Sequence, residues 1–390
     1  MRRRSTHADA VVVGGGVVGA ACALALARAG LQVELVEAAP PRPWSRDNPD
    51  LRVFALASDN IALLDSLGAW ETIRQARAHP YRRMRVWDSA GGDELDFNAD
   101  AFGRRELGWI VENGLLVERL AAALPAAGVD VHCPARVAGF EQDADGVRLM
   151  LEDGGCISAR IAVAADGANS ALRRLSGVGT CGRDYGQRGV VGYVRTGRPP
   201  EDTAWQRFLP GGPLAFLPCA DGTCSIVWSL PEDEASRILA LGDGEFADAL
   251  ERAFGGRLGG IRPCSPRAAF PLRLQLADAM VAGRLLLVGD AAHVVHPLAG
   301  QGVNLGLRDV AALAGLAADR AGRWDSPSRL LRWARRRQSE NHVAALTFDG
   351  IDRVFSNDAV VPTLLRGHLF GAAARIPPVA HGLWRRAAGL

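Results

Sequence analysis

The chain has 390 residues, 48% hydrophobic and 23% charged, as in ordinary globular proteins, and its length predicts at least two substructures. The 45 basic and 43 acidic residues leave a net charge of +2, so we expect no nucleic-acid partner. All 45 basic residues are arginine, and the absence of lysine excludes Schiff-base enzymes and disfavours P-loop nucleotide hydrolases.

The N-terminal region predicts a strand, a glycine turn and a helix. An uncharged run at 10–27 follows a cluster of arginines, an arrangement that resembles a signal peptide. The three consecutive glycines at 14–16 weaken any membrane helix, and no small-residue cleavage site ends the run. We therefore assign residues 10–13 to a strand, 20–29 to a helix and 33–37 to a second strand.

The glycine turn matches the dinucleotide-binding pattern G-x-G-x-x-G. Gly14 permits the turn, Gly16 lets the backbone approach a pyrophosphate, and Gly19 allows close helix packing. Glu37 ends the second strand, where a carboxylate binds ribose hydroxyls, so the pattern predicts FAD or NAD rather than NADP. The same spacing at 177–182 follows a helical stretch and no strand, which predicts a loop and no second nucleotide-binding unit.

Two later segments place polar turns after buried strands. The segment 160–167 predicts a strand that ends in an Asp-Gly turn, which alone is typical of a helix-capping turn. The segment 285–290 predicts a strand that ends in Gly-Asp. The loop 296–304, HPLAGQGVN, then leads into a helix that runs to about residue 318; alone it is a loop rich in helix breakers.

In this order and at these distances, the three segments resemble the FAD-dependent aromatic hydroxylases of the para-hydroxybenzoate hydroxylase type. Further motifs resemble the ubiquinone-biosynthesis hydroxylase branch of that family, over almost the whole chain. These motifs are Arg52 to Leu56 with Ser58, Leu67 to Trp70, Val111 to Asn113, Leu217 and Pro218 with Val227 to Ser229, His296 to Leu307, and Arg375 to Gly389.

The motifs and the resemblance predict a mixed α/β fold. A Rossmann-like FAD domain is interleaved with a β-sheet substrate domain, and a C-terminal helical segment follows. The expected boundaries are 1–75, 105–181 and 276–325 for the FAD domain, 76–104 and 182–275 for the substrate domain, and 326–390 for the helical segment.

Local patterns fill in the last two of these regions. We predict a strand at 189–194 and a hairpin, 214–219 with 223–230, that turns at Asp221 and Gly222. The arginines of the helical segment are expected on a solvated face. They are Arg332, Arg335, Arg336 and Arg337. Five apolar residues of the substrate region could be pocket wall or sheet core, and the sequence leaves both open. They are Trp205, Phe208, Leu214, Phe216 and Trp228.

The resemblance implies which residues hold FAD. The first motif takes the ADP half, the Asp-Gly turn supports the pyrophosphate region, and the Gly-Asp aspartate holds the ribityl chain. The loop after it runs along the flavin ring, with a proline as wall and backbone N–H groups near the N1/O2 edge. The full predicted set is Gly14, Gly16, Gly19, Glu37, Arg52, Arg119, Asp166, Gly167, Asp290, Pro297, Gly300, Gly302, Val303 and Asn304. Arg119 stands where relatives carry glutamine.

No catalytic side chain or metal ligand is assigned, and His293 and His296 are interpreted as loop residues. The implied activity is hydroxylation of the aromatic ring of a polyprenylated phenol in ubiquinone biosynthesis. It uses O2 and NAD(P)H and proceeds through a flavin C4a-hydroperoxide. The alternatives are a soluble aromatic-acid hydroxylase, expected to clamp a carboxylate with charge, and a non-catalytic flavoprotein scaffold. A flavin-dependent halogenase is disfavoured, because its mechanism resembles one that needs an active-site lysine and this chain has no lysine.

Two features bear on location. The seven cysteines form no C-x-x-C pair, which favours a reducing, cytoplasmic compartment. Residues 360–390 mix apolar and basic side chains and are too broken by glycine and proline to span a bilayer. We predict peripheral contact of this tail with the inner face of the membrane or with a ubiquinone-biosynthesis assembly. A helix pair packed on the flavin domain is an equal alternative.

Overall fold

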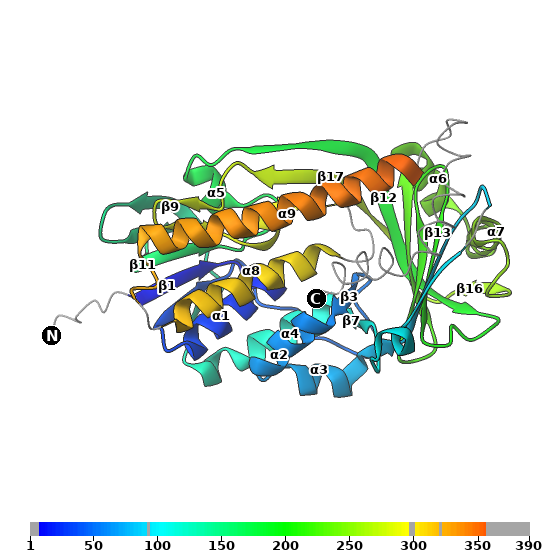
Figure 1. Ribbon diagram of the computed structural model, residues 1–390, viewed down its shortest axis with the longest axis horizontal. Coiled ribbons are helices and arrows are strands. Elements are labelled where there is room, and N and C mark those ends of the chain that lie inside the picture. The colour runs from blue at the N-terminus through cyan, green and yellow to red at the C-terminus, as the bar shows by residue number, and fades with distance from the viewer. Residues whose placement is uncertain (1–7, 92–93, 296–300, 320–321, 356–390) are drawn as a thin grey trace.

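The computed structural model describes residues 8–91, 94–295, 301–319 and 322–355. Two large β-sheets occupy its two ends (Figure 1), an eight-stranded one at the left and a nine-stranded one at the right. Helix α9 (orange) runs along the upper side from the first toward the second. The mixed α/β fold predicted from the sequence is confirmed.

The eight-stranded sheet is built around parallel strands that are covered on both faces. Its order is β18-β19-β11-β1-β2-β8, with β10 and then β9 added to β11. Five of the six residues of β1 are buried, which explains its nearly unbroken apolar sequence. The strands are β1 (Ala8–Val13), β2 (Val33–Val36), β8 (Asp130–His132), β9 (Val137–Gln142), β10 (Val147–Leu151), β11 (Cys156–Ala164), β18 (Val281–Ala282) and β19 (Leu285–Leu287).

Strand pairing brings the three sequence motifs to one edge. β11 pairs in parallel with β1 on one side, Val13 opposite Ala164, and with β19 on the other, Ala164 opposite Leu287. The carboxyl ends of these three strands are therefore adjacent. A ligand site is expected at such an edge.

Helices cover the eight-stranded sheet and link it to the rest. α1 buries nine of its twelve residues, four of them alanines, between the sheet and α8. The helices are α1 (Val17–Arg28), α2 (Ser58–Ser66), α3 (Trp70–Arg77), α4 (Asn113–Ala123), α5 (Ala171–Leu175), α6 (Glu232–Ala240), α7 (Asp243–Phe254), α8 (Gln301–Ala318) and α9 (Pro327–Phe355), with short 3-10 turns η1 (Ala99–Phe102), η2 (Pro125–Ala127) and η3 (Gly289–Ala291).

The nine-stranded sheet has the order β20-β17-β12-β15-β14-β13-β5-β6, with β16 added to β12. Helices α6 and α7 lie on its outer side in Figure 1. Its strands are β5 (Arg83–Asp88), β6 (Leu95–Asn98), β12 (Thr180–Thr196), β13 (Thr203–Phe208), β14 (Leu214–Pro218), β15 (Cys224–Pro231), β16 (Ile261–Pro263), β17 (Ala268–Ala277) and β20 (His293–Val294). A small third sheet joins β3 (Val53–Ala57), β7 (Gly108–Glu112) and β4 (His79–Tyr81).

Most local expectations are confirmed, and three need correction. His293, interpreted as a loop residue, lies in β20 and is buried. The strand at 189–194 lies within β12, and the predicted hairpin is β14 with β15. The segment 177–182 is not all loop, because β12 begins at Thr180; the glycines lead into a strand and not into a helix. Arg337 is not on a solvated face: it is buried and bound to Asp309, whereas the other three arginines are exposed.

Within the ranges that the structure describes, no helix is both long enough and apolar enough to cross a membrane. The predicted membrane-binding segment, 360–390, lies outside the described residues.

Candidate functional site at the edge of the parallel strands

A cavity of about 1070 Å³ is lined by residues of all three sheets. It begins at the strand edge where the three motifs meet and reaches the inner face of the nine-stranded sheet. Nine of the predicted cofactor-binding residues line it: Gly14, Gly16, Glu37, Arg52, Asp166, Gly167, Asp290, Gly302 and Val303. The structure thus brings together residues that are up to 289 positions apart in the chain.

Five predicted residues are not part of this lining. Pro297 and Gly300 lie outside the described residues. Gly19 is packed against the turn, since a Cβ there would come within 1.9 Å of the Gly14 carbonyl oxygen. Arg119 projects from α4, with Nη1 3.5 Å from a neighbouring glutamate, and its contact with flavin stays a prediction. Asn304 is fully buried and bonds β3 to α8.

Three glycines keep the cavity wall open to an incoming ligand. A Cβ added at Gly16, Gly167 or Gly302 would meet no atom within 4 Å, although each residue lines the cavity. Gly14, by contrast, has a left-handed φ of 105°, and a Cβ there would meet the Ala165 carbonyl oxygen at 2.4 Å. The turn is therefore held by backbone contacts behind it and is open in front. A pyrophosphate fits such a cradle at the start of α1.

Two carboxylates at the turn offer acceptors to hydroxyl groups. Glu37 follows β2 directly, and its carboxylate accepts hydrogen bonds from the backbone N–H groups of Gly15 and Ala39. Asp166 accepts from the first N–H groups of α5 through Oδ2, at 2.7 and 3.1 Å. Its Oδ1 is buried and has no partner among the described residues. Both carboxylates therefore retain acceptor capacity toward a sugar or polyol.

Asp290 lies in η3 and faces the cavity. Its side chain is accessible from the cavity, yet protein surrounds it on the remaining sides. Burial raises the pKa of its carboxyl, while the charges of His293 and Arg52 act in the opposite direction. A hydroxyl donor would satisfy this carboxylate. Together, the open glycine cradle and the acidic acceptors fit the pyrophosphate, ribose and ribityl groups of FAD.

A buried hub that the sequence did not reveal fixes the η3 turn. Asp309, on α8, accepts from the Gly289 N–H at 3.1 Å and from His293 Nε2 at 2.6 Å. Its other oxygen accepts from Arg337 Nε at 2.8 Å and Asn341 Nδ2 at 3.1 Å. Burial alone would raise the pKa of Asp309, but the charges and hydrogen bonds of His293 and Arg337 hold it below its usual range.

The segment that carries Arg52 is tied to both neighbouring sheets. The carboxylate of Asp50 accepts from the Arg52 N–H at 3.0 Å and from Asn113 Nδ2 at 2.9 Å. From β12, the Tyr193 hydroxyl donates to the Asp50 carbonyl at 2.8 Å. The Arg52 guanidinium lies 6.0 Å from the centre of the Phe270 ring. Arg52 thus lines the cavity beside the sheet wall, where its charge acts on Asp290.

A buried ion pair behind this segment joins the sheets further. Arg77, from α3, contacts Glu112 at 2.9 Å and Asp221, in the hairpin turn of the nine-stranded sheet, at 2.8 Å. Glu112 also accepts from Trp44 Nε1 at 2.9 Å. The contacts hold the β14–β15 turn against the small sheet. They therefore fix the position of the nine-stranded sheet relative to the small sheet, and both sheets line the cavity.

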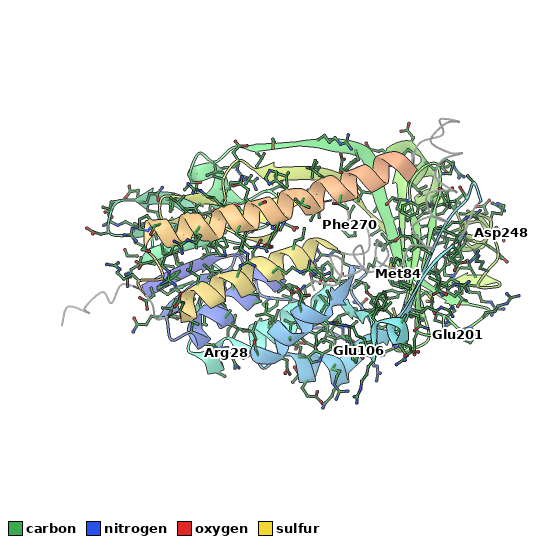
Figure 2. The ribbon with its side chains drawn as sticks, viewed as in Figure 1. Arg28, Met84, Glu106, Glu201, Asp248 and Phe270 are labelled. Carbon is green, nitrogen blue, oxygen red and sulfur yellow. The ribbon has the colours of Figure 1, made fainter. Side chains whose placement is uncertain are left out.

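The inner face of the nine-stranded sheet forms an apolar wall. Its lining includes Met84, Val191, Ala204, Ala215, Leu217, Val227, Phe270 and Leu272. Figure 2 marks Met84 and Phe270 on the side of this sheet that faces α8. Leu214, Phe216 and Trp228 lie on the opposite face, in a core with Phe246 and Phe254. Alternation along each strand thus makes these three sheet core, while Trp205 borders both core and cavity and Phe208 is buried outside the lining.

The family model described as FAD binding domain matches residues 7–345. The chain belongs to this FAD-binding family. The match and the relatives below make it an FAD-dependent monooxygenase, with FAD as its cofactor.

Several relatives of this FAD-dependent monooxygenase match over nearly its full length. The ubiquinone hydroxylase UbiL of Rhodospirillum rubrum is 38% identical over 389 residues, which cover 98% of this chain and 90% of the relative. The 3-demethoxyubiquinol 3-hydroxylase of Escherichia coli is 36% identical and is matched over 98% of both chains. Among solved structures, p-nitrophenol 4-monooxygenase PnpA of Pseudomonas putida has a TM-score of 0.78 at 20% identity, with 98% of both chains covered. The last likeness concerns the fold alone.

Proposed function

We propose that the protein hydroxylates the aromatic ring of a polyprenylated phenol in ubiquinone biosynthesis, with O2 as oxidant and NAD(P)H as reductant. The observation that carries the substrate class is the apolar wall of the cavity. Of the described lining residues that the nine-stranded sheet contributes, one is charged, Arg273. The names of the relatives in Rhodospirillum rubrum and Escherichia coli support the same substrate class.

In this proposal the strand edge holds the cofactor and the sheet holds the substrate. The backbone at Gly14 and Gly16 takes the pyrophosphate, Glu37 the adenosine ribose and Asp290 the ribityl chain. Bound FAD supplies electron transfer from NAD(P)H and the activation of O2. The protein orients the ring beside it, and the apolar wall excludes water, which would otherwise compete for the activated oxygen.

Activity with two substrate classes tests this assignment. The FAD-loaded protein is supplied with NADH or NADPH and with either a short-chain prenylated phenol or 4-hydroxybenzoate, and O2 uptake and products are measured. Hydroxylated product from the prenylated phenol is expected. Product from 4-hydroxybenzoate alone would favour a soluble aromatic-acid hydroxylase that uses Arg273 or Arg52 as its carboxylate clamp. NAD(P)H turnover with neither compound would favour a scaffold role.

Asp290→Asn is expected to weaken FAD binding roughly tenfold to a hundredfold, since hydrogen bonds to charged groups contribute about 1.5–3 kcal/mol. Because burial raises the pKa of Asp290, wild-type affinity should fall as the pH is lowered through that pKa, and the amide variant should lose this dependence. Fluorescence titration of the apoprotein with FAD measures both. Asp65→Asn, on the exposed side of α2, is the control. Unchanged affinity in the Asp290 variant would contradict the ribityl assignment.

We also propose that the FAD and substrate domains have the boundaries expected from the sequence, and that residues 360–390 dock on the membrane surface or on an assembly. A polyprenylated substrate resides in the bilayer, so the enzyme must meet it at the surface or in an assembly. Residues 360–390 carry four arginines and no acid, a composition suited to an anionic surface. Deletion of 360–390 should reduce sedimentation with phosphatidylglycerol vesicles at low salt. If the folded, FAD-loaded deletion variant sedimented as much as the full chain, the proposed membrane contact of residues 360–390 would be contradicted.

A further inference from the structure

One polar side chain interrupts the apolar wall of the cavity. Gln206, on β13, lies in register with Val86 on β5 and with Ala215 on β14. The register continues from Ala215 to Val227 on β15 and from there to Val191 on β12. Gln206 is therefore the polar member of a row across five strands whose other members are small or branched aliphatic residues. An aliphatic residue at 206 would continue this row.

The amide of Gln206 faces the cavity and has no hydrogen-bond partner among the described residues. Its side chain lines the cavity and the residue is 7% exposed, yet it makes no hydrogen bond with any residue in the described part of the chain. The amide of Gln275 instead donates to the Ala168 carbonyl at 2.9 Å, and that of Gln187 to a carbonyl at 3.2 Å. Once an apolar ligand displaces water from the cavity, an amide left unpaired would cost about 1–3 kcal/mol. The arrangement therefore points to a partner supplied by whatever occupies the cavity.

The chemistry of the wall limits what that partner can be. A primary amide offers two N–H donors and one carbonyl acceptor without charge. Ser229 adds a second neutral group to the lining; it lies two residues beyond Val227 on β15 and is 2% exposed. A hydroxyl group on an otherwise apolar ligand matches these groups, because it can donate to the amide carbonyl, whereas a carboxylate would call for a cation at this position.

We propose that Gln206 hydrogen-bonds an oxygen substituent of the substrate ring and so determines which phenols are accepted. The inference rests on the proposed function and adds to it the residue that recognises the ring. The amide carbonyl accepts the phenolic O–H, while the aliphatic row beside it contacts the apolar part of the substrate. A site built to pair a hydroxyl discriminates against an analogue that lacks the donor.

A pair of probes tests this residue directly. FAD-loaded wild type is titrated with 2-prenylphenol and with its methyl ether, 2-prenylanisole, and binding is followed by the change in flavin absorbance. Wild type should bind the phenol about tenfold more tightly than the ether. Gln206→Leu should bring the ratio of dissociation constants close to one with unchanged FAD occupancy. Gln275→Leu, whose amide is already paired outside the cavity lining, should keep the wild-type ratio.

The outcomes separate this inference from the proposed function. A tenfold preference that persists in Gln206→Leu overturns the role of Gln206 and leaves the proposed function standing. If wild type binds no 2-prenylphenol and does not hydroxylate it, the proposed function fails and this inference fails with it. Gln206→Met, which keeps the length of the side chain, replaces the leucine variant in the same titration if leucine disturbs FAD loading.

Discussion

Asp309→Leu is expected to lower the free energy of unfolding by about 3–5 kcal/mol, the range for removing one partner of a buried ion pair. The substitution leaves Arg337 Nε and His293 Nε2 inside the protein without the carboxylate that accepts from them, although Arg337 keeps its contacts with Glu340 and Asn341. It also frees the Gly289 N–H, which anchors the η3 turn beneath the cavity. FAD occupancy should therefore fall together with stability.

Urea unfolding followed by circular dichroism measures this loss. The matched control is Asp319→Leu. It removes a half-exposed carboxylate that directly follows α8 and pairs with Arg329. Exposed pairs contribute about 0–1 kcal/mol, so the control should change stability little. Equal losses in the two variants would show that the hub does not stabilise the fold.

The stability that the Asp309 carboxylate contributes should depend on pH, because the pKa of Asp309 is lowered in the folded protein. An acid whose pKa is lowered in the folded state contributes stability above its unfolded value of about 3.9 and loses it as the pH falls through the folded value. The stability difference between wild type and Asp309→Asn should thus be largest at neutral pH and shrink below about pH 4. A difference that grows on acidification would contradict the ionised state of Asp309.

Gly16→Leu is expected to yield folded protein that is purified without FAD. The backbone of Gly16 has φ −67°, which any residue adopts, and a Cβ there meets no protein atom within 4 Å. The added side chain would fill the space that the cofactor needs. Gly19→Leu is the contrasting variant, because its Cβ would lie 1.9 Å from the Gly14 carbonyl oxygen and disrupt the turn itself.

Two measurements distinguish these variants. Flavin absorbance at visible wavelengths reports the cofactor, and thermal unfolding without added FAD reports the fold. Gly16→Leu should show no flavin absorbance but should keep the melting temperature of the wild-type apoprotein. Gly19→Leu should show no flavin absorbance and should also melt at a lower temperature. A yellow Gly16→Leu protein with normal FAD content would show that the pyrophosphate lies elsewhere.

The strand edge could be predicted because each motif there follows the buried carboxyl end of a strand. Runs such as 10–13 and 285–288 have the apolar composition of parallel strands with both faces covered, and the turn residues follow at once. Gly14 has a left-handed φ, Gly19 is closely packed, and Gly16 leaves open space for a ligand, and these three needs leave a recognisable spacing. Local chemistry was thus sufficient to place the nucleotide end of the cavity.

The substrate end depended on long-range pairing that a sequence does not display. Arg337 was expected in solvent because three arginines surround it, and only the approach of α9 to α8 pairs it with Asp309. Alternation in β14 gives Phe216 to the core and Leu217 to the cavity, but the direction of that alternation depends on which face α7 covers. Gln206 differs from the aliphatic residues that lie in register with it on the neighbouring strands, and the sequence does not show which residues those are.

The most direct test of the whole account is isotopic. FAD-loaded protein is incubated with NAD(P)H, a short-chain prenylated phenol and ¹⁸O₂ in ordinary water, and the product is analysed by mass spectrometry. One ¹⁸O atom in a new ring hydroxyl, absent without FAD, is the predicted result. Consumption of NAD(P)H with release of hydrogen peroxide and no labelled phenol, from a protein saturated with that compound, would contradict the assignment as its hydroxylase.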